Sequence, residues 1–397
     1  MDVNKIEQTI DHARLTPGES LPWPSLLAMA AATFVVVSGE LLPTAVLPTL
    51  AAELDVSLGR AGLLVSAWAA MVVLASFPLA RATARFDRPL VIAVALVVFA
   101  VATLVTAAST TYAAALASRL VAAAATGLLW STINAHAAAI VAPERVARAA
   151  AVVLAGGSLG TVAAIPAGNA LVPLFGWRLP FVALAVLALV TAGVLARLLR
   201  KPQSLRLDDP IPAASGMRPR LGPVLVIAGL GGMVLTAHFA AFTFVAELLA
   251  ASTVPTAVLL LVFGVVGWLG VVLVGATSDR FPGSTPVVMA TVMAVSLAAL
   301  TLLGGHRGVD LVIVVVWGLV TGAVGPAVQG AVMRRAGAAH RSTAGTLMPV
   351  AMNLGIAVGA AAGSAVVDLW SVQVLPLLAV APAILAASGV RRVARPA

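Results

Sequence analysis

Three ionisable residues lie deep inside apolar stretches of this sequence: Glu40, Arg119 and His238. If those stretches cross a membrane, an ionised side chain there costs at least about 2.5 kcal/mol unless it faces a bundle interior or a wet cavity. Burial disfavours the charged carboxylate, so Glu40 is suited to carry a proton. Arg119 keeps its charge, and His238 is a second candidate for titration. Each also has a structural interpretation, in which it only hydrogen-bonds neighbouring helices.

The sequence lacks the residues and motifs for thiol chemistry, nucleotide binding and metal binding. The chain has no Cys, which excludes disulfides, thiolate metal sites and thiol nucleophiles. No phosphate-binding G-x-x-x-x-G-K-(S/T) or H-E-x-x-H motif is present. The five His are scattered at positions 12, 136, 238, 306 and 340. We therefore expect neither a cofactor nor an enzyme, and an ion or solute gradient as the energy source for any uphill transport.

The composition indicates the elements that must position these residues. Of the 397 residues, 61% are hydrophobic and 10% charged, with a mean hydropathy of +1.07, whereas soluble domains have about 25% charged residues. Apolar runs long enough to cross the roughly 30 Å hydrocarbon core recur throughout. We predict an all-α polytopic membrane protein with twelve transmembrane helices, near residues 24–47, 60–80, 89–108, 111–139, 149–172, 178–198, 222–248, 256–277, 285–304, 310–332, 343–367 and 371–389.

The positive charge is distributed by topology. With the amino terminus inside, 20 of the 24 Lys and Arg residues fall in segments on the cytoplasmic side. This is the bias of the positive-inside rule, and it predicts a multi-pass protein of the cell membrane with both termini in the cytoplasm. The net charge of +9 therefore does not indicate a nucleic-acid partner. The polar first 22 residues lack the features of a secretory signal and are expected to form a cytosolic tail.

An internal repeat divides the chain. An offset of 195 pairs Thr126-Gly127 with Thr321-Gly322 and Gly160 with Gly355, and sets Leu235 opposite Glu40. We expect a tail (1–22), a six-helix bundle (23–199), a polar cytoplasmic linker (200–221), a second six-helix bundle (222–390) and a tail (391–397). Two pseudo-symmetric halves are typical of transporters whose site lies between them.

Several motifs resemble those of the major facilitator superfamily, and specifically its bacterial drug:proton antiporter branch near the sugar-efflux and arabinose-efflux-like permeases. They are GELLPTAVLP at 39–48, RLVAAAATGLLW at 119–130, GGSLGTVAAIPAG at 156–168 and GATSDRF at 275–281. The resemblance covers roughly residues 24–390. It implies a major facilitator fold that works by alternating access, and a part in proton transfer for Arg119.

Further site residues follow from helical spacing and from the resemblance. Trp130 and Asn134 lie four residues apart on one helix face, and with three other residues they are expected to line the substrate cavity: Thr126, Phe242 and Asn353. Gating or hinge residues are expected in the small-residue spans and the short cytoplasmic loops: Arg85, Gly156, Gly160, Pro166, Gly168, Gly275, Asp279 and Arg280. Simple packing or a solvated turn is the alternative for each. Interfacial solvation is the expected role of Glu247 and Asp368.

The function expected from these residues is proton-coupled efflux of a small amphipathic solute (a drug, sugar or metabolite) without strong negative charge. A uniporter or importer of the same fold is the alternative. A sensor or a membrane-embedded enzyme is a remote one, because no signalling domain or cluster of catalytic groups is found. We expect a monomer in the lipid bilayer whose partners are the solute and protons.

Overall fold

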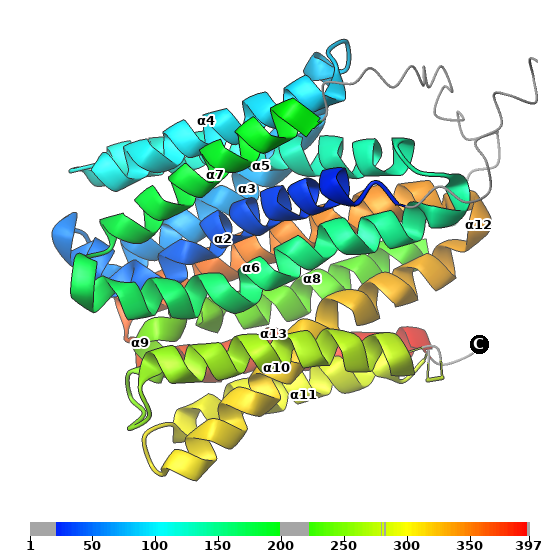
Figure 1. Cartoon of the computed structure of the whole chain (residues 1–397). Helices are drawn as coiled ribbons and strands as arrows, with labels where there is room; N and C mark the ends of the chain where they lie inside the picture. Colours follow the sequence, from blue (N-terminus) through cyan, green and yellow to red (C-terminus); the bar gives the residue numbers. More distant parts are fainter. Residues whose placement is uncertain (1–20, 199–221, 279, 282, 395–397) are drawn as a thin grey trace, which may run out of the picture.

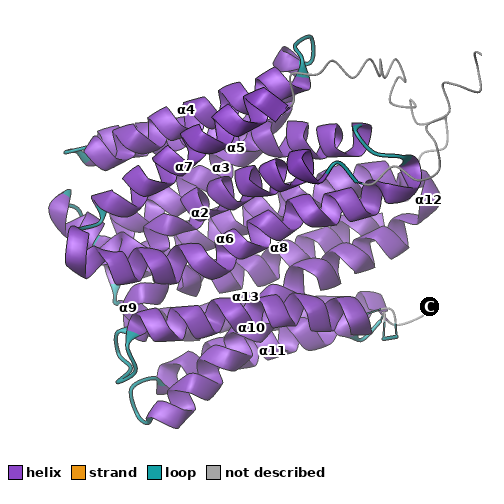
Figure 2. Cartoon of the chain, in the orientation of Figure 1, coloured by secondary structure: helices purple, strands orange, loops and turns teal. Residues whose placement is uncertain are grey.

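The structure, a computed structural model, describes residues 21–198, 222–278, 280–281 and 283–394. Every regular element in these ranges is helical (Figure 2). Twelve helical stretches in the described part are long and apolar enough to cross a membrane. The number and approximate positions of the predicted spans are therefore confirmed. The expected linker, most of the amino-terminal tail, part of the carboxy-terminal tail and Asp279 lie outside the described residues.

The first half of the chain consists of six long helices, which are joined by short loops. Ser57 begins α3 by accepting a hydrogen bond from the Arg60 N–H at 3.1 Å, and Thr111 begins α5 in the same way with the Ala114 N–H at 3.3 Å, as N-cap residues do. The helices are α2 (Trp23–Glu53), α3 (Leu58–Thr83), α4 (Arg88–Ala108), α5 (Tyr112–Ala139), α6 (Val146–Phe175) and α7 (Arg178–Leu198).

The second half departs from the predicted spans at two places. The predicted span 222–248 breaks after Phe242, where the Thr243 hydroxyl bonds the Phe239 carbonyl at 2.6 Å. The predicted spans 310–332 and 343–367 belong to one 63-residue helix, which continues through the residues between them. The helices are α8 (Gly222–Phe242), α9 (Val245–Leu249), α10 (Thr256–Thr277), α11 (Thr285–Ala299), α12 (Arg307–Leu369) and α13 (Leu375–Ala394).

The long helix α12 supplies two membrane crossings, Arg307–Ala336 and Leu347–Leu369. At about 1.5 Å per residue a straight helix of this length would extend about 95 Å, roughly three times the hydrocarbon core. The helix must therefore turn back between the two crossings. The helices that form these crossings run side by side in one bundle (Figure 1).

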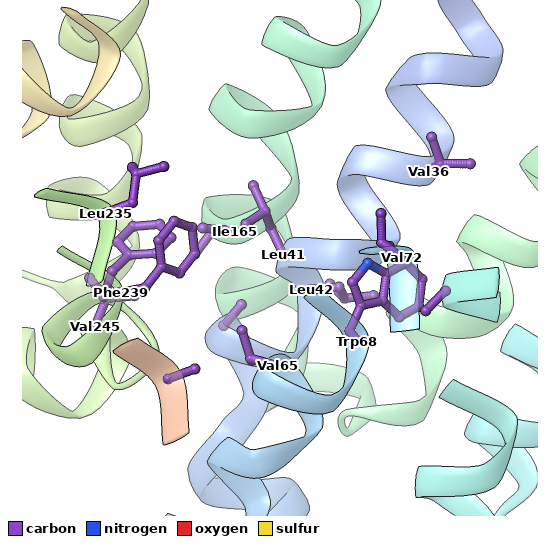
Figure 3. Close-up of a cluster of buried hydrophobic side chains, with 14 of the residues drawn as sticks. Val36, Leu41, Leu42, Val65, Trp68, Val72, Ile165, Leu235, Phe239 and Val245 are labelled. Carbon is purple, nitrogen blue, oxygen red and sulfur yellow. The ribbon is translucent and has the colours of Figure 1, made fainter. Parts of the chain in front are cut away.

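Loops alternate between the two sides of this bundle. One side, which we call the Ser57 side, holds the connections that follow α2, α6 and α9 and the last turn of α12; the opposite side, the Trp23 side, holds the start of α2 (Figure 1). A continuous apolar core joins the two halves. In Figure 3, Leu41 and Val65 of the first half lie between Trp68 and the second-half residues Leu235 and Phe239. The core therefore crosses the interface between the halves.

Candidate functional site

Arg119 is buried at the centre of the first half and contacts α2 and α3. Its Nη1 donates to the Gly39 carbonyl at 2.7 Å and its Nη2 to the Glu40 carbonyl at 3.4 Å. Its guanidinium carbon lies 4.0 Å from the centroid of the Trp68 ring. Charge-assisted hydrogen bonds contribute about 1.5–3 kcal/mol each, and a desolvated cation–π contact about 2 kcal/mol. Arg119 thus binds the backbone of α2 and the face of an α3 side chain.

The local sequence of α2 explains why Gly39 needs this partner. In an α-helix the Gly39 carbonyl would accept from the N–H four residues ahead, which is Pro43 and has none. A buried carbonyl without a partner costs about 1–3 kcal/mol. Arg119 supplies the missing donor. The Phe99 ring fills the space beside Gly39. A Cβ at this position would lie 2.5 Å from that ring, so a larger residue would clash with it.

The side-chain carboxyl of Glu40, unlike its backbone carbonyl, is not bonded to Arg119. The structure brings Glu40 and Arg119 together through the backbone, and no ion pair or hydrogen bond to the Glu40 carboxyl is present among the described residues. The two charged groups are close enough for their charges to interact. The predicted neighbourhood is therefore found, with the arginine bonded to the peptide carbonyls of α2.

Accessibility along α2 changes at Glu40. From Ala31 onward, the partly exposed residues are Ala31, Phe34, Val37 and Glu40, spaced three apart, whereas residues 41 to 47 are all buried. The matching helix α8 behaves in the same way, with partly exposed Leu230, Met233 and Thr236 followed by ten buried residues. Glu40 is thus the last accessible position of an α2 stripe that begins on the Trp23 side.

His238 occupies an aromatic cluster in the second half. The Trp317 indole N–H donates to its Nδ1 at 3.2 Å, and the Phe242 ring stacks on it with centroids 4.7 Å apart. The rings of Phe239 and Phe263 also pack against the His238 ring. Because Nδ1 accepts a hydrogen bond, a neutral His238 carries its proton on Nε2, and protonating it would break the Trp317 bond. This geometry favours packing over titration for His238, and it also gives Phe242 a stacking role.

Helix contacts correct the register of the repeat for the first span of each half. Gly160 packs on Phe34 and Gly168 on Leu42; their counterparts Gly355 and Gly363 pack on Gly232 and Ala240. The glycines differ by 195 positions, as expected, but their partners differ by 198. His238, and not Leu235, is therefore the counterpart of Glu40. The sequence offset of 195 was derived from other helices, where it does hold. There Gly127 packs on Val72 and Gly322 packs on Gly267, so both the glycines and their partners are 195 positions apart.

Three of the residues predicted to line the cavity use their polar groups within their own helices. Thr126 is buried and donates to the Ala122 carbonyl at 3.0 Å. Asn134 is exposed and donates to the Trp130 carbonyl at 3.1 Å, and Asn353 donates to the Pro349 carbonyl at 3.0 Å. Both asparagines retain their side-chain oxygens for a ligand, whereas the Thr126 hydroxyl faces its own backbone.

Trp130 is half-buried at the boundary between α5 and α6. A Cβ added to Gly157 of α6 would lie 3.5 Å from the Trp130 ring. The ring therefore packs closely on a glycine of the neighbouring helix. Its position one turn from exposed Asn134 is compatible with the cavity role expected from the sequence.

The glycines predicted for gating are found at close helix contacts. A Cβ at Gly156 would overlap the Ala30 carbonyl, and one at Gly160 would lie 2.8 Å from the Phe34 carbonyl. Small residues permit such approaches. Pro166 leaves the Val162 carbonyl without its helical donor, and Gly264 of α10 packs directly on that carbonyl. This last contact joins the two halves.

The loop residues predicted for gating are exposed in this structure. Arg85 lies over the Phe86 ring at 4.9 Å and Arg280 over the Phe281 ring at 5.8 Å. Nothing lies within 4 Å of a Cβ built at Gly275. Gly275 is therefore not required here by close packing. Its expected partner in the motif, Asp279, lies outside the described residues.

Two carboxylates on the Ser57 side make contacts that the sequence interpretation missed. Asp368, expected to be merely solvated, accepts hydrogen bonds from Ser57 and from the Gly59 N–H across the two halves. Asp310 is fully buried and accepts from the Ser252 hydroxyl at 2.5 Å and the Gly304 N–H at 3.1 Å. Their positions near helix ends were visible in the sequence, but Ser57, Gly59 and Ser252 come from distant segments.

An apolar groove of about 600 Å³ lies between α11 and α13. It is lined by Thr291, Ala294, Val295, Ala298, Val380, Ile384, Ala387, Ser388 and Arg391. None of the residues discussed above borders it. The groove is thus separate from the centre formed by Glu40, Arg119 and Trp68.

Comparison with known proteins identifies the family. The Major Facilitator Superfamily model matches residues 29–360, which extend over most of both halves and include all three ionisable candidates. The chain belongs to the major facilitator superfamily. Members are secondary transporters and not enzymes, as the sequence predicted. This chain is therefore a multi-pass membrane transporter.

Similar major facilitator proteins include drug-efflux pumps. A chloramphenicol efflux pump of Mycobacterium tuberculosis is 31% identical over 359 residues, covering 86% of each chain. A chloramphenicol resistance protein of Streptomyces lividans is 31% identical over 346 residues, covering 85% of this chain and 88% of the other. The inner membrane transport protein YdhP of Escherichia coli is 28% identical over 348 residues, covering 86% and 88%.

Solved major facilitator structures confirm the fold. A bacterial homologue of the human lysosomal transporter Spinster superimposes with a TM-score of 0.75 at 16% identity, covering 95% of this chain and 98% of that one. The nucleoside transporter NupG gives a TM-score of 0.75 at 13% identity, covering 94% and 100%. At these identities the likeness concerns the fold alone.

Proposed function

We propose that this transporter exports a small amphipathic solute in exchange for protons, with Glu40 as the proton-carrying group. The observation that supports this most directly is the position of Glu40 at the end of the accessible α2 stripe, beside an arginine whose hydrogen bonds go to the backbone. An unpaired carboxylate at this depth is costly. Proton uptake removes that charge, so the protonation state and the conformation are coupled.

Arg119 has a positioning role in this proposal. Its fixed charge faces α2, and its bonds to Gly39 and Glu40 hold the backbone that carries the carboxyl. Its Nε has no hydrogen-bond partner among the described residues. The guanidinium therefore retains one donor for the carboxylate when α2 and α5 move during the cycle.

The substrate class follows from the groups around this centre. Leu41, Val65, Leu235 and Phe239 form an apolar junction between the halves (Figure 3), and Arg119 is the buried cation of the described spans. Mostly apolar walls with few polar groups suit a compact solute with apolar and hydrogen-bonding parts. Chloramphenicol, named for two relatives, is the first compound to test.

Orientation follows from charge. The predicted cytoplasmic segments hold most of the Lys and Arg residues, and we therefore infer that the Trp23 side faces the cytoplasm. The accessible stripe leading to Glu40 then opens toward the cytoplasm. In this orientation the structure corresponds to the state that collects solute from the cell, and the transporter works as a monomer by alternating access.

The test compares Glu40→Gln with Glu247→Gln in proteoliposomes. Glu247 is an exposed acid of α9, so its substitution controls for the loss of one carboxylate. Radiolabelled chloramphenicol uptake is measured with an imposed pH gradient and, separately, as exchange at equal pH. A panel of amphipathic compounds in expressing cells selects another substrate if chloramphenicol is not transported.

The expected result is loss of gradient-driven accumulation in Glu40→Gln while exchange continues, and no loss of either in Glu247→Gln. Exchange reports substrate binding and conformational cycling without net proton movement, so it separates coupling from folding. Gradient-driven accumulation that survives in Glu40→Gln would exclude Glu40 as the proton carrier. A uniporter would show exchange and no response to the pH gradient in the unmodified protein.

A further inference from the structure

Asp368 joins the two halves on the Ser57 side. It lies in the last turn of α12, in the second half, and its Oδ1 accepts from the Gly59 N–H at 3.0 Å. Its Oδ2 accepts from the Ser57 hydroxyl at 2.9 Å. Ser57 is the N-cap of α3, in the first half. One carboxylate of the second half therefore caps a helix of the first.

The chemistry of a helix start explains why a carboxylate fits here. The first N–H groups of α3 lack helical acceptors, and the helix dipole adds partial positive charge at this end. An ionised Asp368 supplies both an acceptor and an opposite charge. Asp368 and Ser57 are exposed to solvent, so water can replace their hydrogen bond at little cost.

Close packing extends this contact along α3 and α12. A Cβ at Gly59 would overlap the Ser364 carbonyl and the Asp368 carboxylate, and one at Gly62 would lie 2.6 Å from the Ser364 hydroxyl oxygen. Further along, the Ser66 hydroxyl donates to the Ala357 carbonyl at 2.7 Å. The two halves thus meet closely from Ser57 to Ser66. A path to the Ser57 side requires this contact to separate.

We propose that Asp368, through Ser57 and Gly59, is a releasable latch that holds the Ser57 side closed and sets the balance between closed and open states. The proposal rests on the alternating-access transport proposed above. Asp368 acts through α3 and does not touch the substrate, so it is a positioning residue. Its effect should appear in the conformational balance even when no substrate is present.

The absence of Cys from the chain provides a clean background for the test. Cysteines are placed at Ala52 in α2 and Leu369 in α12, both exposed on the Ser57 side and one in each half. Spin labels on this pair report the distance between the halves by pulsed electron paramagnetic resonance. The full-length protein in lipid nanodiscs is compared with Asp368→Asn, Ser57→Ala and the control Glu247→Gln.

Asp368→Asn should raise the ratio of open to closed molecules about threefold to tenfold, because the charge and one acceptor are lost. Ser57→Ala, which leaves the Gly59 bond, should give a smaller shift in the same direction. Raising the salt concentration should open the unmodified latch and have less effect on Asp368→Asn. Glu247→Gln should leave the distances unchanged.

Distances in Asp368→Asn that match the Glu247→Gln control would overturn the latch. If Asp368→Asn does not fold, Ser57→Ala and the salt response of the unmodified protein decide the question, and no shift in either would also overturn it. The measurement needs neither substrate nor a proton gradient. The latch can therefore fail while Glu40-dependent efflux stands, and the reverse is equally detectable.

Discussion

The Nη1 of Arg119 donates a 2.7 Å hydrogen bond to the carbonyl of Gly39, the one carbonyl in that turn of α2 that Pro43 leaves without a helical donor. Pro43 in α2 thus removes a hydrogen-bond donor that Arg119 in α5 replaces. This arrangement keeps the guanidinium beside Glu40 while leaving the Glu40 carboxyl unpaired. Its consequences can be tested at the level of individual atoms.

Arg119→Ala should destabilise the protein by about 1–3 kcal/mol, since the Gly39 carbonyl then lacks a partner in a buried setting. Pro43→Ala restores the helical N–H, so the same Arg119→Ala change should cost less in a Pro43→Ala background. Thermal unfolding in detergent measures the four proteins of this double-mutant cycle. Equal costs in both backgrounds would contradict the proposed link between Pro43 and Arg119.

Trp68→Ala should weaken transport and lower stability, because the Arg119 guanidinium lies over the Trp68 ring. The cation–π part contributes about 2 kcal/mol when desolvated. Trp68→Phe keeps an aromatic face and should retain more activity than Trp68→Ala. Transport rates and unfolding temperatures for both variants give the comparison, and identical behaviour of the two would show that the aromatic face is unimportant.

Gly156→Ala should abolish or strongly reduce transport and destabilise the protein by about 1–3 kcal/mol, since the added methyl group would overlap the Ala30 carbonyl. Gly275→Ala is its matched control, because nothing lies within 4 Å of the new Cβ. That change should be neutral or slightly stabilising, given the higher helix propensity of Ala. Expression level, unfolding temperature and transport are measured together. Loss of transport without destabilisation in Gly275→Ala would support the gating role expected for that glycine.

His238→Gln should keep proton-driven transport, because the Gln carbonyl can accept the Trp317 N–H that His238 accepts now. His238→Leu removes that acceptor and should cost about 1–3 kcal/mol of stability. Uptake under an imposed pH gradient, compared with exchange at equal pH, separates the two effects. Selective loss of the gradient-driven component in His238→Gln would make His238 a second proton carrier.

Composition and apolar periodicity determined much of this protein by themselves. Twelve spans and the candidate pair Glu40 and Arg119 follow from the sequence, because a bilayer forces backbone hydrogen bonds into helices and makes buried charges rare. The transporter family was indicated by the resemblance of several sequence motifs. The glycines at 156, 160 and 168 were likewise recognisable from their spacing. The i to i+4 relation between Gly39 and Pro43 is also a local signal, since it marks the carbonyl that needs another donor.

The tertiary structure decided which atoms meet. Arg119 bonds a carbonyl of α2, His238 takes the place in α8 that corresponds to Glu40, and Asp368 caps a helix whose N-cap residue lies 311 positions earlier. Such contacts depend on the relative shift of neighbouring helices. An offset that aligns most helices of the two halves gives the wrong counterpart in a helix that is shifted by three residues, nearly a full turn. Side-chain partners across the two halves are set by helix packing, which no local sequence pattern encodes.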